Sequence, residues 1–243
     1  MKQLIWDLPT RLFHWGLAGS VLAAYAIAQL ADKETPLFYL HVVFAVLAGL
    51  LMVWRIFWGI FGSKHSKFSN LFFSPQEIIS YFKDVVAGKG RYYAGHNPGG
   101  AVVILTMFVL ILIVLLSGVM TGLTEVAEEV HEVTTNLLII AVVFHVIGVL
   151  LATIMHKEKY ILSMLNGKKT GSPEDGISKS HSFEAIIMLL LVGSGWIYFI
   201  KGFDRETAIF TAPGTQWSFQ IGEPSEGGDG TEEHSGEDLE DDD

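Results

Sequence analysis

Four histidines lie in or at the edge of strongly apolar stretches of the chain: His14, His41, His131 and His145. An imidazole is rare inside a membrane segment and calls for a hydrogen-bond partner, a proton path or a metal ion. Taken singly, such a histidine is more often a packing or proton-path residue than a ligand. The chain has no cysteine, which excludes disulfides, thiolate zinc sites, iron–sulfur clusters and covalently attached haem. Any metal ion must be held by His, Met or carboxylate side chains.

The spacing of the last two histidines is informative. His131 and His145 are fourteen residues apart, which on a helix places them about 40° apart in angle and about 21 Å apart along the axis. They share a face but cannot bind one metal ion. They can, however, supply one axial ligand to each of two stacked haems, and two bis-imidazole haems need four histidines.

Depth in the membrane suggests how the four histidines pair. Because alternate helices run in opposite directions, His41, just after the outer start of the second apolar stretch, meets His131 at the outer start of the fourth. His14 is then left to pair with His145, although the estimated boundaries put His145 several ångströms deeper in the membrane. His156 is a rival because it returns to nearly the same helix face eleven residues after His145. A haem at His156 would lie about 37 Å from one at His131, which exceeds the hydrocarbon core of roughly 30 Å. Distance therefore favours His145.

The elements that must position these residues are transmembrane helices. Half of the chain is apolar, only 17% is charged, and the mean hydropathy is +0.41. A span needs roughly 20 apolar residues, and five stretches approach that length: 11–30, 37–61, 99–122, 132–155 and 183–200. We expect the first stretch to stay as an anchor because no small-residue cleavage site follows a short apolar core. The sequence predicts an all-α, multi-pass membrane protein.

Two features of the connecting segments also predict local structure. Asn97 and Pro98 suit the N-cap and first position of a helix, so the third stretch should begin there. Residues 75–86 place apolar side chains on one side and predict an amphipathic helix. It either lies on the inner membrane surface or is an ordinary cytoplasmic loop helix.

The charges predict the orientation of the helices. With the N-terminus in the cytoplasm, thirteen of the sixteen Lys and Arg residues fall on the cytoplasmic side, and only Lys33, Lys201 and Arg205 fall outside. Residues 204–243 carry thirteen acidic residues and one Arg. We expect this tail to be disordered and periplasmic, on a protein of the bacterial inner membrane. It is either a solubilising tail or an attractant for a basic partner.

Several short motifs resemble those of the integral-membrane cytochrome b subunits of nickel–iron hydrogenases and related bacterial di-haem b-type cytochromes. They are Trp6-Asp7-Leu8-Pro9-Thr10-Arg11-Leu12-Phe13-His14-Trp15, Arg55 with Trp58-Gly59, Gly95-His96-Asn97-Pro98, and Met164-Leu165-Asn166-Gly167-Lys168-Lys169. The resemblance covers about residues 5–170. It implies a four-helix bundle with two non-covalent b-type haems, with one ligand on each of the first two helices and two on the fourth. These positions match His14, His41, His131 and His145.

The resemblance divides the chain into three parts. Residues 1–170 form the di-haem cytochrome b four-helix membrane domain, 171–203 a linker and a fifth transmembrane helix, and 204–243 the acidic tail. Arg11 and Arg55 are candidates to pair with propionates of the inner haem, against the alternative that they are ordinary residues of a basic membrane edge. His96 is a candidate for a quinone oxygen or a propionate, against the alternative of a surface loop residue.

The expected function is electron transfer between the quinone pool and a periplasmic redox protein, either a hydrogenase subunit or a soluble cytochrome c. One alternative is a stand-alone enzyme that oxidises a small reductant such as superoxide and reduces quinone. Another is a haem-free transporter or assembly factor. We expect contacts with membrane lipid and no nucleic-acid partner, and the sequence is compatible with a homo-oligomer.

Overall fold

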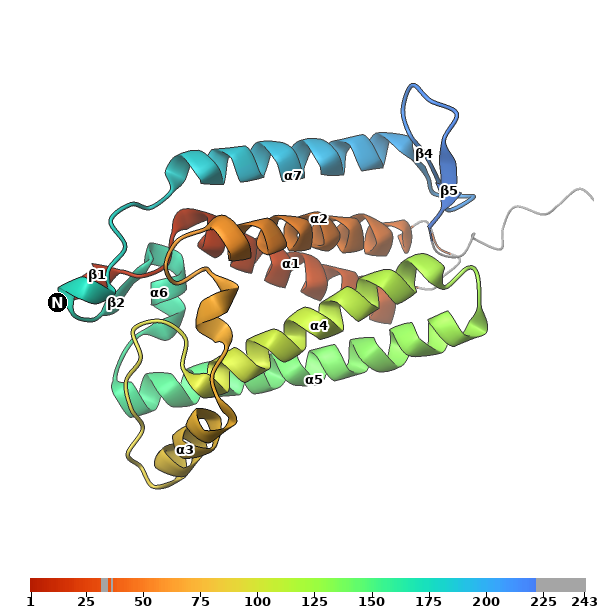
Figure 1. The fold of residues 1–243 in the computed structure, drawn as a ribbon. Coiled ribbons are helices and arrows are strands. Elements are labelled where there is room, and N and C mark those ends of the chain that lie inside the picture. The colour runs from red at the N-terminus through yellow and green to blue at the C-terminus, as the bar shows by residue number, and fades with distance from the viewer. Residues whose placement is uncertain (32–34, 36, 222–243) are drawn as a thin grey trace, which may run out of the picture.

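The computed structural model describes residues 1–31, 35 and 37–221 and consists mainly of helices (Figure 1). In chain order the elements are β1 (Lys2–Leu4), α1 (Leu8–Leu30), α2 (Tyr39–Phe61), a 3₁₀ turn (Phe68–Leu71), α3 (Pro75–Val86), α4 (Pro98–Met120), α5 (Glu125–His156), α6 (Tyr160–Asn166), β2 (Lys168–Thr170), a second 3₁₀ turn (Pro173–Asp175), α7 (Ser182–Gly202), β3 (Phe203–Asp204), β4 (Ile209–Thr211) and β5 (Ser218–Gln220).

The five long helices run lengthwise beside one another, with α1 and α2 between α7 on one side and α4 and α5 on the other (Figure 1). Successive long helices alternate in direction. One end of the bundle, which we call the basic end, holds the starts of α1, α4 and α7 and the ends of α2 and α5. The opposite end, which we call the sheet end, carries β3, β4 and β5 (Figure 1).

Within the described part of the chain, four helices are long and apolar enough to cross a membrane: α2, α4, α5 and α7. The protein is therefore a multi-pass membrane protein. Helix α1 is as long as α2, at 23 residues, and packs along it. It is less apolar because small residues, His14 and Gln29 dilute its larger apolar side chains, so its crossing stays a prediction.

The helix starts follow the capping residues. Asn97 accepts a hydrogen bond from the backbone N–H of Gly100 at 2.6 Å, and Pro98 is the first residue of α4, as the sequence predicts. The amphipathic helix is also confirmed as α3, where Ser74 and Glu77 form a reciprocal capping box. Its position on the membrane surface stays a prediction.

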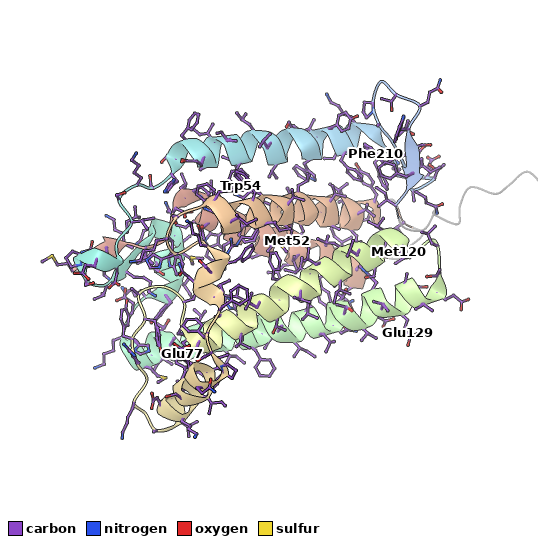
Figure 2. The ribbon with its side chains drawn as sticks, viewed as in Figure 1. Met52, Trp54, Glu77, Met120, Glu129 and Phe210 are labelled. Carbon is purple, nitrogen blue, oxygen red and sulfur yellow. The ribbon has the colours of Figure 1, made fainter. Side chains whose placement is uncertain are left out.

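Apolar packing on both sides of α2 holds the layers together. Trp54 packs with Met188 of α7, whereas Met52 packs with Ile111 of α4 and Leu138 of α5. Figure 2 shows Trp54 and Met52 on opposite sides of α2. Helices α1 and α2 thus form the middle layer because α2 buries apolar side chains in two directions.

The expectation that disorder begins at residue 204 is wrong for the first part of the tail. Strands β3, β4 and β5 form a three-stranded antiparallel sheet in that order. Phe210 of β4 is buried with Phe199 of α7 and Val43 of α2, and its position under the end of α7 is visible in Figure 2. Phe210 and its aromatic neighbour thus bury apolar area, although the average composition of residues 204–243 is strongly acidic. The strongly acidic residues 222–243 lie outside the described residues.

A second small sheet joins the segment before α1 to the segment after α6. Strand β1 pairs antiparallel with β2, so that Lys2 lies opposite Thr170 and Leu4 opposite Lys168. The backbone N–H groups of Ile5 and Trp6 also donate to the carbonyl of Gly167, at 2.8 and 3.1 Å. This ribbon fixes the start of α1 against the segment that follows α6.

Candidate haem site

The imidazoles of His41 and His131 face each other between α2 and α5 near the sheet end. Their ring centroids are 6.2 Å apart, and their planes are inclined at 81°. His41 Nδ1 lies 2.9 Å from the carbonyl oxygen of Ala24, and His131 Nδ1 lies 3.0 Å from that of Val114. Because a carbonyl can only accept, Nδ1 carries the proton in each ring. Each Nε2 is then the unprotonated nitrogen of a neutral imidazole, which is the protonation state of a metal-ligating histidine. We call these residues the sheet-end pair.

The imidazoles of His14 and His145 form a second pair nearer the basic end. Their ring centroids are 6.4 Å apart, with an angle of 51° between the planes. His14 Nδ1 is buried and has no hydrogen-bond partner among the described residues. A buried polar atom is normally satisfied, so this imidazole has unused bonding capacity. We call His14 and His145 the basic-end pair.

The structure thus brings together the histidines that depth in the membrane predicts to pair. His14 lies six residues after the start of α1 and His145 eleven residues before the end of α5, so facing rings imply that α5 extends roughly 8 Å beyond the start of α1. His156, the rival position, faces the rings of Tyr92 and Tyr160 and not another imidazole. That the two pairs hold iron stays a prediction.

Both pairs fit a haem. Two imidazole nitrogens that each lie about 2 Å from one metal ion place their ring centroids roughly 6 Å apart, and the observed separations are 6.2 and 6.4 Å. No group of three or more His, Asp or Glu side chains gathers in the described ranges. Each pair therefore offers two nitrogen ligands, which is the protein's share of a site where a porphyrin provides the other four.

The side chains around the pairs are small or apolar. A Cβ atom added to Gly118 of α4 would lie only 2.9 Å from His131 Cε1 and 3.0 Å from its Nδ1. Leu138 is seven residues from each histidine of α5 and is 2% exposed. It therefore lies between the two pairs on the same helix face, packed against Met52 and Ile111.

The contact at Gly118 leads to a prediction with a matched control. Gly118→Ala should displace the His131 ring and lower the occupancy of the haem at the sheet-end pair, because the ring cannot keep both its position and its bond to Val114. Gly148→Ala in α5 adds a methyl group that meets nothing within 4 Å beyond its own stretch of helix, and it should leave haem content unchanged. Haem per chain, measured by absorbance against protein concentration, checks both. Equal haem content in the two variants would contradict the prediction.

Comparison with known protein families decides the identity of the chain. The model of a family described as prokaryotic cytochrome b561 matches residues 5–167, which include all four histidines. The chain belongs to the prokaryotic cytochrome b561 family. The resemblance to bacterial membrane b-type cytochromes is thereby confirmed, over almost the range expected. No curated protein and no solved structure matches the chain.

Membership of the cytochrome b561 family makes the protein a membrane b-type cytochrome that takes part in electron transfer and binds b-type haem. The matched region ends after α6. Helix α7 and the sheet of β3, β4 and β5 are therefore additions outside the matched region. They pack on the α2 side of the bundle, away from α4 and α5 (Figure 1).

The two candidate arginines of this cytochrome lie at the basic end in different surroundings. Arg55 is 7% exposed, and its Nη1 has no hydrogen-bond partner among the described residues. Its guanidinium lies over the rings of Phe68, at 4.6 Å, and Phe13, at 5.9 Å. Arg11 Nη1 donates to the carbonyl of Leu165 at 2.5 Å. Arg55 is thus a buried cation with a free donor, as expected for a group that binds an anion. Arg11 Nε is also buried without a partner among the described residues, but Arg11 in addition holds α6 through its Nη1.

Asp7 is a central residue of the basic end that sequence reasoning missed. It is 1% exposed and accepts hydrogen bonds from the backbone N–H of Thr10 at 2.7 Å, from Trp58 Nε1 at 3.1 Å and from the hydroxyl of Ser63. It therefore caps α1 and ties that helix to the end of α2. Its place before Leu8 and Pro9 is an N-cap signal that predicts the first role. No local signal predicts the second.

Lys169 is buried at the basic end, and His96 is half-buried there. Lys169 is 1% exposed, donates to the carbonyls of Tyr93 and Gly95, and lies 4.6 Å from the centroid of the Tyr160 ring. Burial lowers the pKa of Lys169 to about 8. The His96 ring packs 4.8 Å from that of Trp6. Burial, with the nearby charges of Arg55 and Lys169, lowers the pKa of His96 to about 3, so this imidazole is neutral at physiological pH.

Proposed function

We propose that this cytochrome carries two b-type haems, one held by His41 and His131 and the other by His14 and His145. It transfers electrons across the membrane between the quinone pool and a periplasmic redox protein, either a hydrogenase subunit or a soluble cytochrome c. The observation that carries the proposal is the presence of two facing imidazole pairs, with centroids 6.2 and 6.4 Å apart.

The ligand set supports electron transfer and not bond-making chemistry. A bis-imidazole haem supplies reversible one-electron chemistry and leaves no open coordination position for oxygen or a substrate. The protein orients the sheet-end imidazoles through their Nδ1–H bonds to Ala24 and Val114. Leu138, with Met52 and Ile111, fills the space between the pairs and excludes water there.

The charge distribution supports the proposed orientation in the bacterial inner membrane. The basic end carries most of the Lys and Arg residues, so it faces the cytoplasm under the positive-inside rule. The sheet end and the acidic tail then face the periplasm. Glu125 and Glu128 in the first turn of α5 add negative charge at that end. This charge favours a basic redox partner and disfavours superoxide, an anion, as the diffusing reductant.

A reduced-minus-oxidised spectrum combined with a haem count tests the proposal directly. We expect two b-type haems per chain, reduced by a quinol in detergent or in liposomes. A colourless protein expressed with ample haem would overturn the whole assignment. One haem per chain would overturn the assignment of four ligands. Two haems that a quinol cannot reduce would remove the quinone pool from the proposal but leave the ligands in place.

Arg55 provides a test of the basic-end haem. Removing a buried positive charge stabilises the oxidised form, so Arg55→Gln should lower the midpoint potential of one haem by about 60 mV, a tenfold change in a one-electron equilibrium. Arg91→Gln is the matched control because Arg91 also lies over an aromatic ring, that of Tyr93 at 5.9 Å, but is exposed. Potentiometric titration should show the control unchanged. Equal potentials in both variants would place Arg55 away from the haem.

A further inference from the structure

A basic cavity lies at the junction of α5 and α6, outside the proposed electron path. Its volume is about 360 Å³, and its lining includes Lys2, Lys157, Lys159 and Lys168. One acidic residue, Glu158, also lines it. Glu158 accepts hydrogen bonds from Lys2 Nζ and from the hydroxyl of Thr170. The positive charge of Lys2 thus neutralises the negative charge of Glu158, and the other three lysines give the cavity a net positive charge.

The cavity lies at the depth of lipid headgroups. Helix α5 has 32 residues, more than the roughly 20 needed to cross the membrane. Its acidic residues are all in its first turns, before Val133, and its apolar run continues to Met155. The surplus length is therefore at the sheet end, and α5 leaves the hydrocarbon at His156. Lys157, the next residue, takes a left-handed conformation with φ of 52° and ends the helix at this level.

Apolar surface adjoins the lysines. Ile154 and Met155 in the last turn of α5 are exposed, as are Ile161, Leu162 and Leu165 of α6. Leu162 also lines the cavity. A ligand in the cavity would therefore meet cationic groups at one end and an exposed apolar wall at the other. A free phosphate ion uses the first feature only, whereas an anionic phospholipid uses both.

We propose that this cavity binds the headgroup of an anionic phospholipid, with the acyl chains along the exposed side chains of α5 and α6. Lys157, Lys159 and Lys168 contact the phosphate-containing headgroup. The bound lipid would hold α6, and through Arg11 the start of α1, against the end of α5. The proposal depends on the transmembrane position of α5 and is independent of haem number and redox partner.

Native mass spectrometry of the haem-loaded protein in mild detergent tests the site. The probes are phosphatidylglycerol and phosphatidylcholine with identical acyl chains. We expect wild-type protein to bind phosphatidylglycerol at least about tenfold more tightly, and the triple variant Lys157→Asn, Lys159→Gln, Lys168→Gln to lose this preference. Asparagine is chosen at 157 because it tolerates a left-handed conformation. The control Lys67→Gln, Lys83→Gln, Lys89→Gln removes three exposed lysines of the basic end outside the cavity and should keep the preference.

Each remaining outcome is decisive. An equal loss of the phosphatidylglycerol preference in the control variant would show that general surface charge attracts the lipid, and would overturn the site. Equal binding of the two lipids by wild-type protein would also overturn it. Displacement of phosphatidylglycerol by excess inorganic phosphate would assign the cavity to soluble phosphate and overturn the lipid assignment. An unchanged haem spectrum and melting temperature show that the variants fold. If the triple variant does not fold, Lys168→Gln alone should still reduce the preference severalfold, and an unchanged preference would overturn the proposal.

Discussion

We expect the replacement of His41 by alanine to remove one of the two proposed haems and to leave the other. The reason is that the sheet-end and basic-end pairs share no ligand, so loss of one imidazole empties one site. His131→Ala should give the same product, and His14→Ala should remove the other haem. Pyridine haemochrome assay against protein concentration should give one haem per chain in each single variant. The double variant His14→Ala, His41→Ala should contain none.

His156→Ala is the matched control for these substitutions. His156 lies on α5, like His131 and His145, but its ring faces Tyr92 and Tyr160 at 5.7 and 6.4 Å. This variant should keep two haems. If His41→Ala and His156→Ala both retain two haems, the pairing is wrong. If all the variants lose haem together, the histidines act through folding and not as individual ligands.

Asp7→Ala destabilises the protein more than loss of any ordinary helix cap. The variant leaves the indole N–H of Trp58 and the backbone N–H of Thr10 without an acceptor in a buried position. An unsatisfied buried donor costs about 1–3 kcal/mol, and loss of an N-cap about 1 kcal/mol. We expect a total of about 3 kcal/mol. A lower melting temperature, followed by haem absorbance or circular dichroism, checks the result.

Ser74→Ala is the control for the capping role of Asp7. Ser74 caps α3 but lies at an exposed site and ties α3 to no other helix. Its loss should cost about 1 kcal/mol or less. Asp7→Asn keeps a side-chain acceptor and should fall between wild type and Asp7→Ala. Similar melting temperatures for Asp7→Ala and Ser74→Ala would show that the bonds to Trp58 and Ser63 contribute little.

Much of the site is predictable because it depends on helix periodicity within one segment. The fourteen-residue spacing of His131 and His145 places both rings on one face, whatever packs against that face. The starts of α3 and α4 follow from Ser74, Pro75, Asn97 and Pro98 by local hydrogen bonding. The boundary of α5 is less well predicted. It starts at Glu125 and not near 132, because Thr124 caps an acidic first turn that hydropathy alone excludes from the span.

The small C-terminal sheet shows where composition misleads. An acidic average over residues 204–243 predicts disorder, but Phe210 finds a buried position against Phe199 and Val43. Such a contact depends on the presence of a neighbouring surface and not on local composition. The same holds for Lys169, since nothing in the run Gly167-Lys168-Lys169 separates the exposed Lys168 from the buried Lys169.

Short-range periodicity and apolar length are enough to predict the long apolar helices, their alternating directions and the shared face of the two histidines on α5. Packing between elements is what brings Asp7 to Trp58, Gly118 to the His131 ring, and Lys169 to the aromatic rings around it. Asp7 and Trp58 are 51 positions apart in the chain, Gly118 and His131 are 13 apart, and Lys169 lies over the ring of Trp6, 163 positions away. The formation of these contacts depends on how helices pack in three dimensions, which no local pattern of residues encodes.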